Sequence, residues 1–101
     1  MAAQPACRAL GVDLDVTHCS TPRRAEGCET VFVNNIPWSC QGHINTPHLK
    51  FSGIGCVIHT APIAEGSPTV IVEGRGGGRV GDKVAGCTWV ATGSPDVFCG
   101  P

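Results

Sequence analysis

A short phrase occurs three times in this chain, and its repetition limits the fold more than any other feature of the sequence. Each copy is a turn of small residues followed by a short apolar strand, and the copies cover residues 25–33, 64–72 and 91–99. Repeats this short cannot each bury an apolar face alone, so the copies must pack on one another. Three strands about a common axis predict an all-β, tapering, three-sided body, that is, a pseudo-threefold cone. The alternative is an ordinary small β-sandwich in which similar turns produced similar hairpins.

The first two copies belong to longer segments that align without gaps. Residues 27–43 and 66–82 match over seventeen positions. In each segment the strand ends at a dipeptide that suits a tight reversal, because Asn and Gly tolerate a positive φ. These dipeptides are Asn34-Asn35 and Glu73-Gly74. No window shows a sustained apolar period of 3.6 residues, which indicates little helix.

The composition indicates a small domain that needs an additional stabilising element. The chain has 101 residues, with 14 glycines, 8 prolines, three Phe and two Trp. A glycine-rich chain loses much backbone entropy on folding, and few large side chains are present here to offset that loss. Disulfides or a bound metal are the usual solution. We expect a single domain over residues 12–101, preceded by a lead-in over residues 1–11 that shows no strong pattern.

Charge and hydropathy exclude several classes of protein. A net charge of −1 provides no basic patch for nucleic acid. No apolar run approaches the length of about 18 residues that a membrane helix needs. The N-terminal residues contain no continuous apolar stretch, so we expect no secretory signal. The chain has seven cysteines but no CxxC pair. Because no secretory signal is expected, reduced thiols and metal ligation are favoured, with a disulfide scaffold as the alternative.

Side chains that can bind a metal precede the three turns at similar distances. His18 lies nine residues before the first turn glycine, His59 seven before the second, and Cys87 six before the third. A pseudo-threefold axis would bring these positions together near one end. Zinc in a structural site takes four nitrogen or sulfur ligands. The spacing therefore predicts a zinc site made of these three residues and one more.

Three residues compete for the fourth position. His48, in the inserted segment 44–58 next to Pro47, is our choice. His43 is second, because its counterpart in the aligned segment is Asp82, which suggests a turn residue. Cys56 forms a CxxH pair with His59 and is a rival ligand. The alternative for all four histidines is that they are packed or hydrogen-bonded in turns.

The remaining cysteines have no predicted role in this site. Cys19 is adjacent to His18 and is sterically awkward as a second ligand on the same ion. The others are expected to be small buried hydrophobic residues, and these are Cys7, Cys28, Cys40 and Cys99.

The sequence gives no support for catalysis. No acidic residue stands in a recognisable His-Glu arrangement that would provide a base beside the metal. The glycine-rich run 74–79 resembles a phosphate-binding loop but lacks the Gly-Lys-Ser/Thr ending, so we expect a flexible turn there. We therefore expect that the protein is not an enzyme and has no small-molecule substrate.

Several motifs resemble those of the PAAR-repeat proteins. They are Gly66–Gly74, Arg79–Asp82, Cys87 and Gly93–Phe98. The resemblance covers roughly residues 12–101 and is most specific over 59–101. The chain departs from the family in its signature tetrapeptide, Pro-Ala-Ala-Arg. The aligned segments have Gly76-Gly77-Gly78-Arg79 and Pro37-Trp38-Ser39-Cys40 in its place, and His43 replaces the usual acidic residue.

The resemblance implies a fold and a function. PAAR-repeat proteins are sharp cones with a zinc ion near the point, held by three histidines and one cysteine, a pattern that His18, His48, His59 and Cys87 match. Iron is the alternative metal. The family caps the homotrimeric β-helical spike of contractile phage tails and type VI secretion systems, which implies a monomer on a trimer. The point would meet the target cell envelope.

The implied location is a virion, at the phage tail tip, or the bacterial cytoplasm with export by the secretion apparatus. Two other functions stay open. One is an adaptor that carries an effector on the spike, and the other is a small disulfide-stapled secreted binding domain.

Overall fold

The computed structural model describes residues 3–17, 19–51, 53 and 55–100. Within these ranges the chain forms short antiparallel strands and turns and contains no helix. Accordingly, none of the described residues belongs to a helix that could cross a bilayer. The strands are β1 (Gln4–Pro5), β2 (Phe32–Val33), β3 (Ile36–Pro37), β4 (His48–Phe51), β5 (Cys56–His59), β6 (Ile71–Val72), β7 (Arg75–Gly76) and β8 (Phe98–Cys99).

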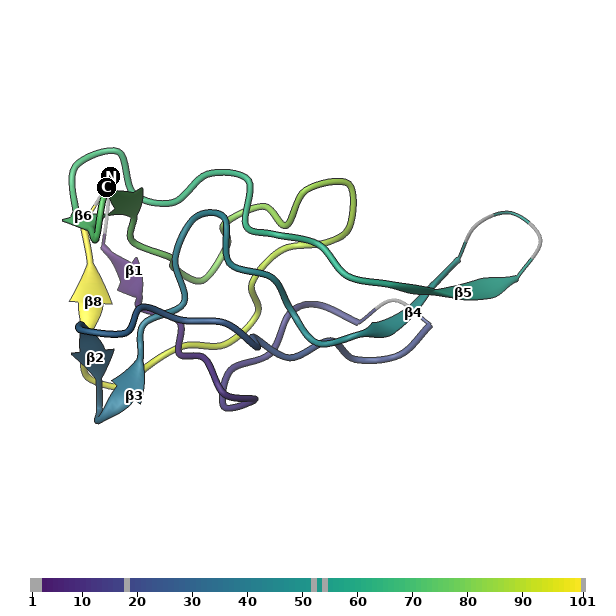
Figure 1. The fold of residues 1–101 in the computed structure, drawn as a ribbon, viewed down its shortest axis with the longest axis horizontal. Coiled ribbons are helices and arrows are strands. Elements are labelled where there is room, and N and C mark those ends of the chain that lie inside the picture. The colour runs from purple at the N-terminus through teal and green to yellow at the C-terminus, as the bar shows by residue number, and fades with distance from the viewer. Residues whose placement is uncertain (1–2, 18, 52, 54, 101) are drawn as a thin grey trace.

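The molecule is elongated and has two different ends. Its extents are 39 × 26 × 24 Å. The pairs β2–β3, β6–β7 and β1–β8 lie at a broad end together with both chain termini, while the hairpin β4–β5 projects at the opposite, narrow end (Figure 1). The predicted small all-β body is confirmed.

Two of the three strand pairs at the broad end are hairpins with the tight turns that the sequence predicts. Val33 pairs with Ile36, and the turn residues between them, Asn34 and Asn35, have φ of 54° and 64°. In the second hairpin the turn is Glu73-Gly74, with φ of 52° and 77°. A two-residue turn with two positive φ angles follows the right-handed twist of the strands that it joins.

The third strand pair is formed by the two ends of the chain and is not a hairpin. β8 pairs with β1, with Cys99 opposite Gln4 and Phe98 opposite Pro5. The segment that we expected to be a lead-in therefore contributes a strand, and its Ala6, Cys7 and Ala9 are fully buried. Because the two partners lie at opposite ends of the chain, no local pattern reveals this pairing.

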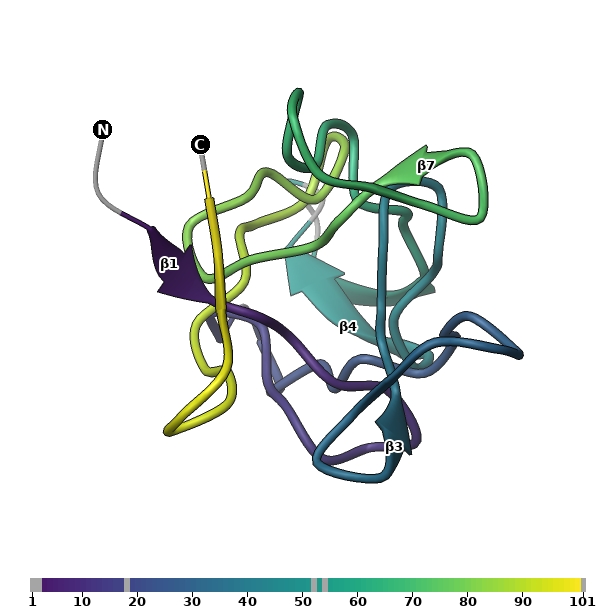
Figure 2. The same ribbon diagram turned by 90° about the vertical axis from the view of Figure 1, so that its left-hand side faces the viewer.

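We call these three units lobes. The first lobe is residues 27–43, the second is residues 66–82, and the third is residues 93–100 together with residues 4–13. Viewed from the broad end, they are arranged around a common axis, and β4 lies behind them (Figure 2).

Equivalent residues of the three lobes meet near this axis and differ in size. We call β2, β6 and β8 the outer strands of the lobes. The residue that follows the pairing partner of each outer strand is Trp38 in the first lobe, Gly77 in the second and Ala6 in the third. A Cβ added to Gly77 would lie only 2.7 Å from the Trp38 ring, so the indole occupies the space that the glycine leaves. The indole nitrogen donates a hydrogen bond to the carbonyl of Gly78 at 2.9 Å. The indole of Trp38, the methyl group of Ala6 and the backbone of Gly77 thus fill the centre together.

Two apolar clusters and a buried ion pair form the interior. The first cluster joins the lobes through Val33, Val72 and Cys99, and the second contains Ile63 and Val84. The ion pair joins Arg24 Nη1 to Asp15 Oδ2 at 2.9 Å, and both side chains are fully buried. Asn45 donates to the same carboxylate oxygen at 3.0 Å. This network ties the segment before the first lobe to the segment after it.

Candidate metal centre

The hairpin β4–β5 brings two histidines together. His48 begins β4, His59 ends β5, and the two are directly opposite in the pairing register. Opposite residues of an antiparallel pair place their side chains on one face of the sheet. The two ring centroids are 5.0 Å apart, with the ring planes at 84°. The residue pairing alone therefore explains why the two imidazoles are neighbours.

Cys87 approaches this pair from a separate loop. Its backbone N–H donates to the carbonyl of Val84 at 2.9 Å, which closes a tight turn. Its sulfur lies 3.2 Å from His48 Nε2. The ligand atoms of Cys87, His48 and His59 all lie within 4.8 Å of one another. Three of the four predicted ligands thus form one cluster.

The tautomer of His48 follows from its second contact. His48 Nδ1 lies 2.9 Å from the carbonyl oxygen of Thr46. A carbonyl oxygen can only accept, so Nδ1 carries the proton and the Nε2 lone pair faces the sulfur of Cys87. Metal-ligating histidines usually have their other ring nitrogen fixed in this way. The side chain is held with its Nε2 lone pair directed into the cluster.

The cluster has the chemistry of a site that takes a transition metal. Imidazole nitrogen and thiolate sulfur are the usual ligands of zinc, and their bond lengths of about 2.0–2.3 Å fit atoms gathered this closely. His48 is only 4% exposed, while His59 and Cys87 are half-buried. Burial raises the pKa of the Cys87 thiol. A metal ion that binds here therefore displaces the thiol proton.

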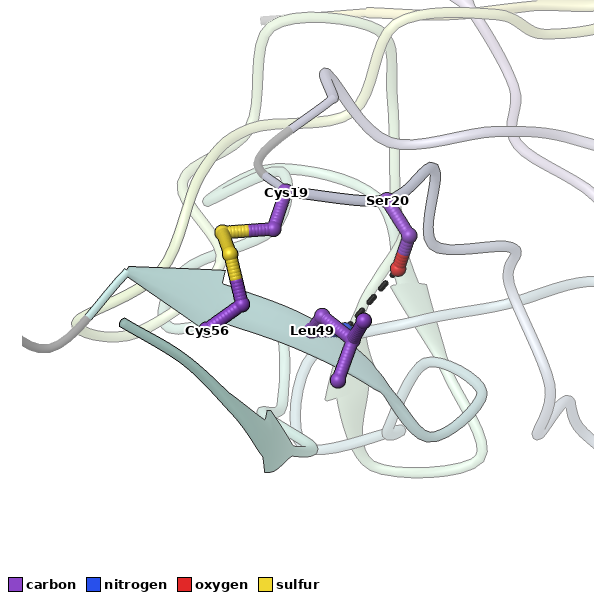
Figure 3. The surroundings of a disulfide bond; sticks show 4 residues. All are labelled: Cys19, Ser20, Leu49 and Cys56. Atoms are coloured by element: carbon purple, nitrogen blue, oxygen red, sulfur yellow. Dashed lines mark hydrogen bonds between the residues drawn. A yellow bond between two sulfur atoms is a disulfide. The ribbon is translucent and has the colours of Figure 1, made fainter.

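His18, the predicted ligand that precedes the first turn, lies outside the described residues. The next residue, Cys19, forms a disulfide with Cys56, the first residue of β5 (Figure 3). Ser20 Oγ accepts a hydrogen bond from the backbone N–H of Leu49 at 2.9 Å. Both contacts fasten the segment after His18 to the projecting hairpin.

The disulfide corrects two of our expectations. Cys56 is not a rival metal ligand, because its sulfur is bonded to that of Cys19. The expectation of reduced thiols is also wrong for Cys19 and Cys56. Across the described chain the other five form no disulfide, namely Cys7, Cys28, Cys40, Cys87 and Cys99. Cysteines 37 positions apart give no sequence signal of pairing, since this depends on how the hairpin is placed.

His43 does not join this cluster. It lies in the first lobe, where it forms a second group with Cys28 and Cys40. We expected these two cysteines to be no more than small buried residues, and they are buried. The flexible turn expected over residues 74–79 is wrong for most of that run. Only Gly74 lies in the β6–β7 turn, while Arg75 and Gly76 form β7, and Gly77 and Gly78 are buried.

Compared with known proteins, the chain matches no protein-family model and no curated protein. The case for a function therefore rests on the residues and their arrangement.

Proposed function

We propose that this chain is a structural tip of the PAAR type, which caps the homotrimeric β-helical spike of a contractile injection apparatus. The observation that carries the proposal is a set of three equivalent apolar side chains at the broad end. Phe32, Ile71 and Phe98 are 54%, 60% and 57% exposed, and each lies on the outer strand of one lobe.

The exposure of these side chains is not a consequence of a disordered or poorly packed end. The next residue of each strand, Val33, Val72 or Cys99, is almost fully buried. Each strand therefore alternates between an inward and an outward apolar residue. Large apolar side chains left in contact with water often mark an interaction surface.

The symmetry of this set specifies the kind of partner. Three equivalent contacts around one axis are best matched by a surface that repeats three times, such as the end of a homotrimer. The short strands of the lobes also offer backbone groups at their edges, which can continue a partner's sheet. A single chain can thus satisfy a threefold partner.

The opposite end has the features of a point that must keep its shape. The hairpin β4–β5 is bonded to Cys19 through Cys56 and contributes His48 and His59 to the cluster with Cys87. We propose zinc as the metal and His18 as the ligand that completes the set, because three imidazoles and one thiolate form a closed tetrahedral site. Its role would be structural, and the point would meet the target cell envelope without catalysis.

The test is binding to a homotrimeric β-helical spike protein of the same organism. Changing Phe32→Glu, Ile71→Glu or Phe98→Glu should weaken binding about 10- to 100-fold each, as expected when a buried apolar contact is lost. The matched control is Ile58→Glu, at a residue that is 78% exposed on the narrow-end hairpin. Equal loss in the control, or binding unaffected by all three changes, would argue against the proposed docking face.

The disulfide favours a second candidate, a small secreted binding domain. Disulfides persist mainly in oxidising compartments. In that case the chain would bind no trimeric spike, and reduction of Cys19–Cys56 would weaken binding to its own partner. A spike tip should still bind the spike after reduction, because the disulfide lies at the other end of the molecule.

A further inference from the structure

The first lobe differs from the other two at three equivalent positions. In the second lobe these positions hold a hydroxyl, a guanidinium and a carboxylate, and the third lobe has the same three groups. In the first lobe they are replaced by two thiols and an imidazole. The sets are Ser67, Arg79 and Asp82 in the second lobe, Ser94, Arg8 and Asp13 in the third, and Cys28, Cys40 and His43 in the first.

In the second and third lobes these groups form closed polar contacts. The backbone N–H of Arg79 donates to Asp82 Oδ2 at 2.8 Å, and its guanidinium pairs with the same carboxylate at 2.9 Å. Arg8 and Asp13 repeat both contacts, at 2.7 and 2.8 Å. The arginine and the aspartate thus neutralise each other in a partly buried place.

The first lobe keeps the backbone contact but changes the side chains. The N–H of Cys40 donates to His43 Nδ1 at 2.9 Å, in the place of the arginine-to-aspartate bond. The sulfur of Cys28 lies 3.6 Å from that of Cys40. The ligand atoms of all three residues lie within 4.8 Å of one another, and the two cysteines are at most 1% exposed.

We propose that Cys28, Cys40 and His43 form a second metal site, which takes a thiophilic divalent ion such as zinc. Two thiolate sulfurs are soft donors, and an imidazole nitrogen also suits zinc, so this set selects such ions. Two thiolates also cancel the charge of a divalent ion, so the bound site carries no net charge. This matters because a buried net charge is costly. The metal would replace the neutral ion pair of the other lobes.

Access and proton balance are consistent with this site. A cavity of about 460 Å³ is lined by Cys28 and His43 together with Glu26, Glu73 and Arg75, so water can reach two of the three residues and would fill the fourth position. Burial raises the pKa of Cys40 to about 12, so the free thiol is protonated. Metal uptake forms two metal–sulfur bonds and releases two protons to solvent. Binding through His43 Nδ1 exchanges the hydrogen bond from Cys40 for a coordinate bond.

The first step of the test is a count of free thiols in denaturant, on protein purified without oxygen or reductant. Five free thiols are expected, since the described chain has one disulfide. A count of three with a Cys28–Cys40 disulfide would overturn the proposal, because the close sulfurs would then be a redox pair.

The second step is a zinc titration of metal-free protein. The Cys87→Ser variant, which lacks the narrow-end thiolate, should still bind one equivalent of zinc. In the same variant Co²⁺ should give a thiolate charge-transfer absorption. The matched variant combines Cys28→Ser, Cys40→Arg and His43→Asp with Cys87→Ser, so that the first lobe receives the residues of the second. It should lose that equivalent and the absorption.

Failure to bind zinc in the Cys87→Ser variant would overturn the proposal, as would unchanged binding after the first-lobe exchange. The Cys87→Ser result does not require the exchanged protein to fold. It is also independent of the spike-tip function, which is tested by spike binding at Phe32, Ile71 and Phe98.

Discussion

At the residue scale, the narrow-end cluster depends on a few defined contacts. His48 is oriented by the Thr46 carbonyl, His59 by its pairing with His48, and Cys87 by its own loop turn. Repeat spacing identified His59 and Cys87, because equivalent positions around an axis converge, whereas His48 was chosen from its place in the inserted segment 44–58. The same reasoning could not identify the Cys19–Cys56 bond, which does not follow the repeat.

Removing a narrow-end ligand should remove a metal ion and stability together. We expect His59→Ala and Cys87→Ser each to lose one equivalent of zinc and at least about 3 kcal/mol of unfolding free energy, since structural zinc contributes far more than that in small domains. Elemental analysis and thermal unfolding measure both quantities. Thr60→Ala, at the exposed neighbouring residue, is the control. Unchanged metal content in both variants would contradict the assignment.

The buried Arg24 gives a sharper stability test than any exposed arginine. Its guanidinium also donates to Ser39 Oγ at 3.2 Å, besides pairing with Asp15. Arg24→Ala would leave the buried Asp15 carboxylate without its charge partner and should cost about 3–5 kcal/mol. The exposed neighbour change, Arg23→Ala, should cost less than about 1 kcal/mol. Urea unfolding of both variants measures the loss of unfolding free energy. A loss for Arg24→Ala as small as that for Arg23→Ala would show that the buried pair does not stabilise the fold.

At the scale of elements, the hairpin turns also join the lobes. The Glu73 carboxylate, in the turn of the second lobe, accepts hydrogen bonds from the N–H and hydroxyl of Thr30 in the first. Asn34, in the turn of the first lobe, donates to the Asp96 carboxylate of the third at 2.8 Å. The turn dipeptides could be predicted from the sequence. These contacts could not, because they depend on how the lobes are arranged.

These carboxylates predict a dependence of stability on pH. The hydrogen bonds from Thr30 lower the pKa of Glu73, and those from Asn34 and Ser94 lower the pKa of Asp96. Their stabilisation is therefore complete above the unfolded pKa values of about 4 and is lost as the pH falls through the lower folded values. The double variant Glu73→Gln and Asp96→Asn should lose less stability on acidification than the parent.

The measurement is the Tm of metal-free protein between about pH 6 and pH 3, so that metal release does not contribute. Glu65→Gln, at an exposed glutamate, is the control and should follow the parent. If the double variant also follows the parent, these contacts do not link the lobes energetically.

The group formed by Cys28, Cys40 and His43 was not predicted from the sequence. The alignment of residues 27–43 with 66–82 already contained the three exchanges at Cys28, Cys40 and His43. Taken singly, each is an unremarkable buried residue. Only the structure shows that the three share one place, and that the N-terminal segment supplies the third equivalent set.

At the scale of the whole molecule, one asymmetric chain presents three similar lobes at one end and a single fastened hairpin at the other (Figures 1 and 2). A threefold axis can be followed at the broad end and is lost at the narrow end. The proposed spike tip needs this combination, because it would join a trimer at one end and form a single point at the other.

The central claim is that one chain satisfies a threefold partner, and its most direct test is the stoichiometry of the complex with the homotrimeric spike. Native mass spectrometry should give one chain per spike trimer, with no further binding when the chain is in excess. Three chains per trimer, or no complex, would contradict the account.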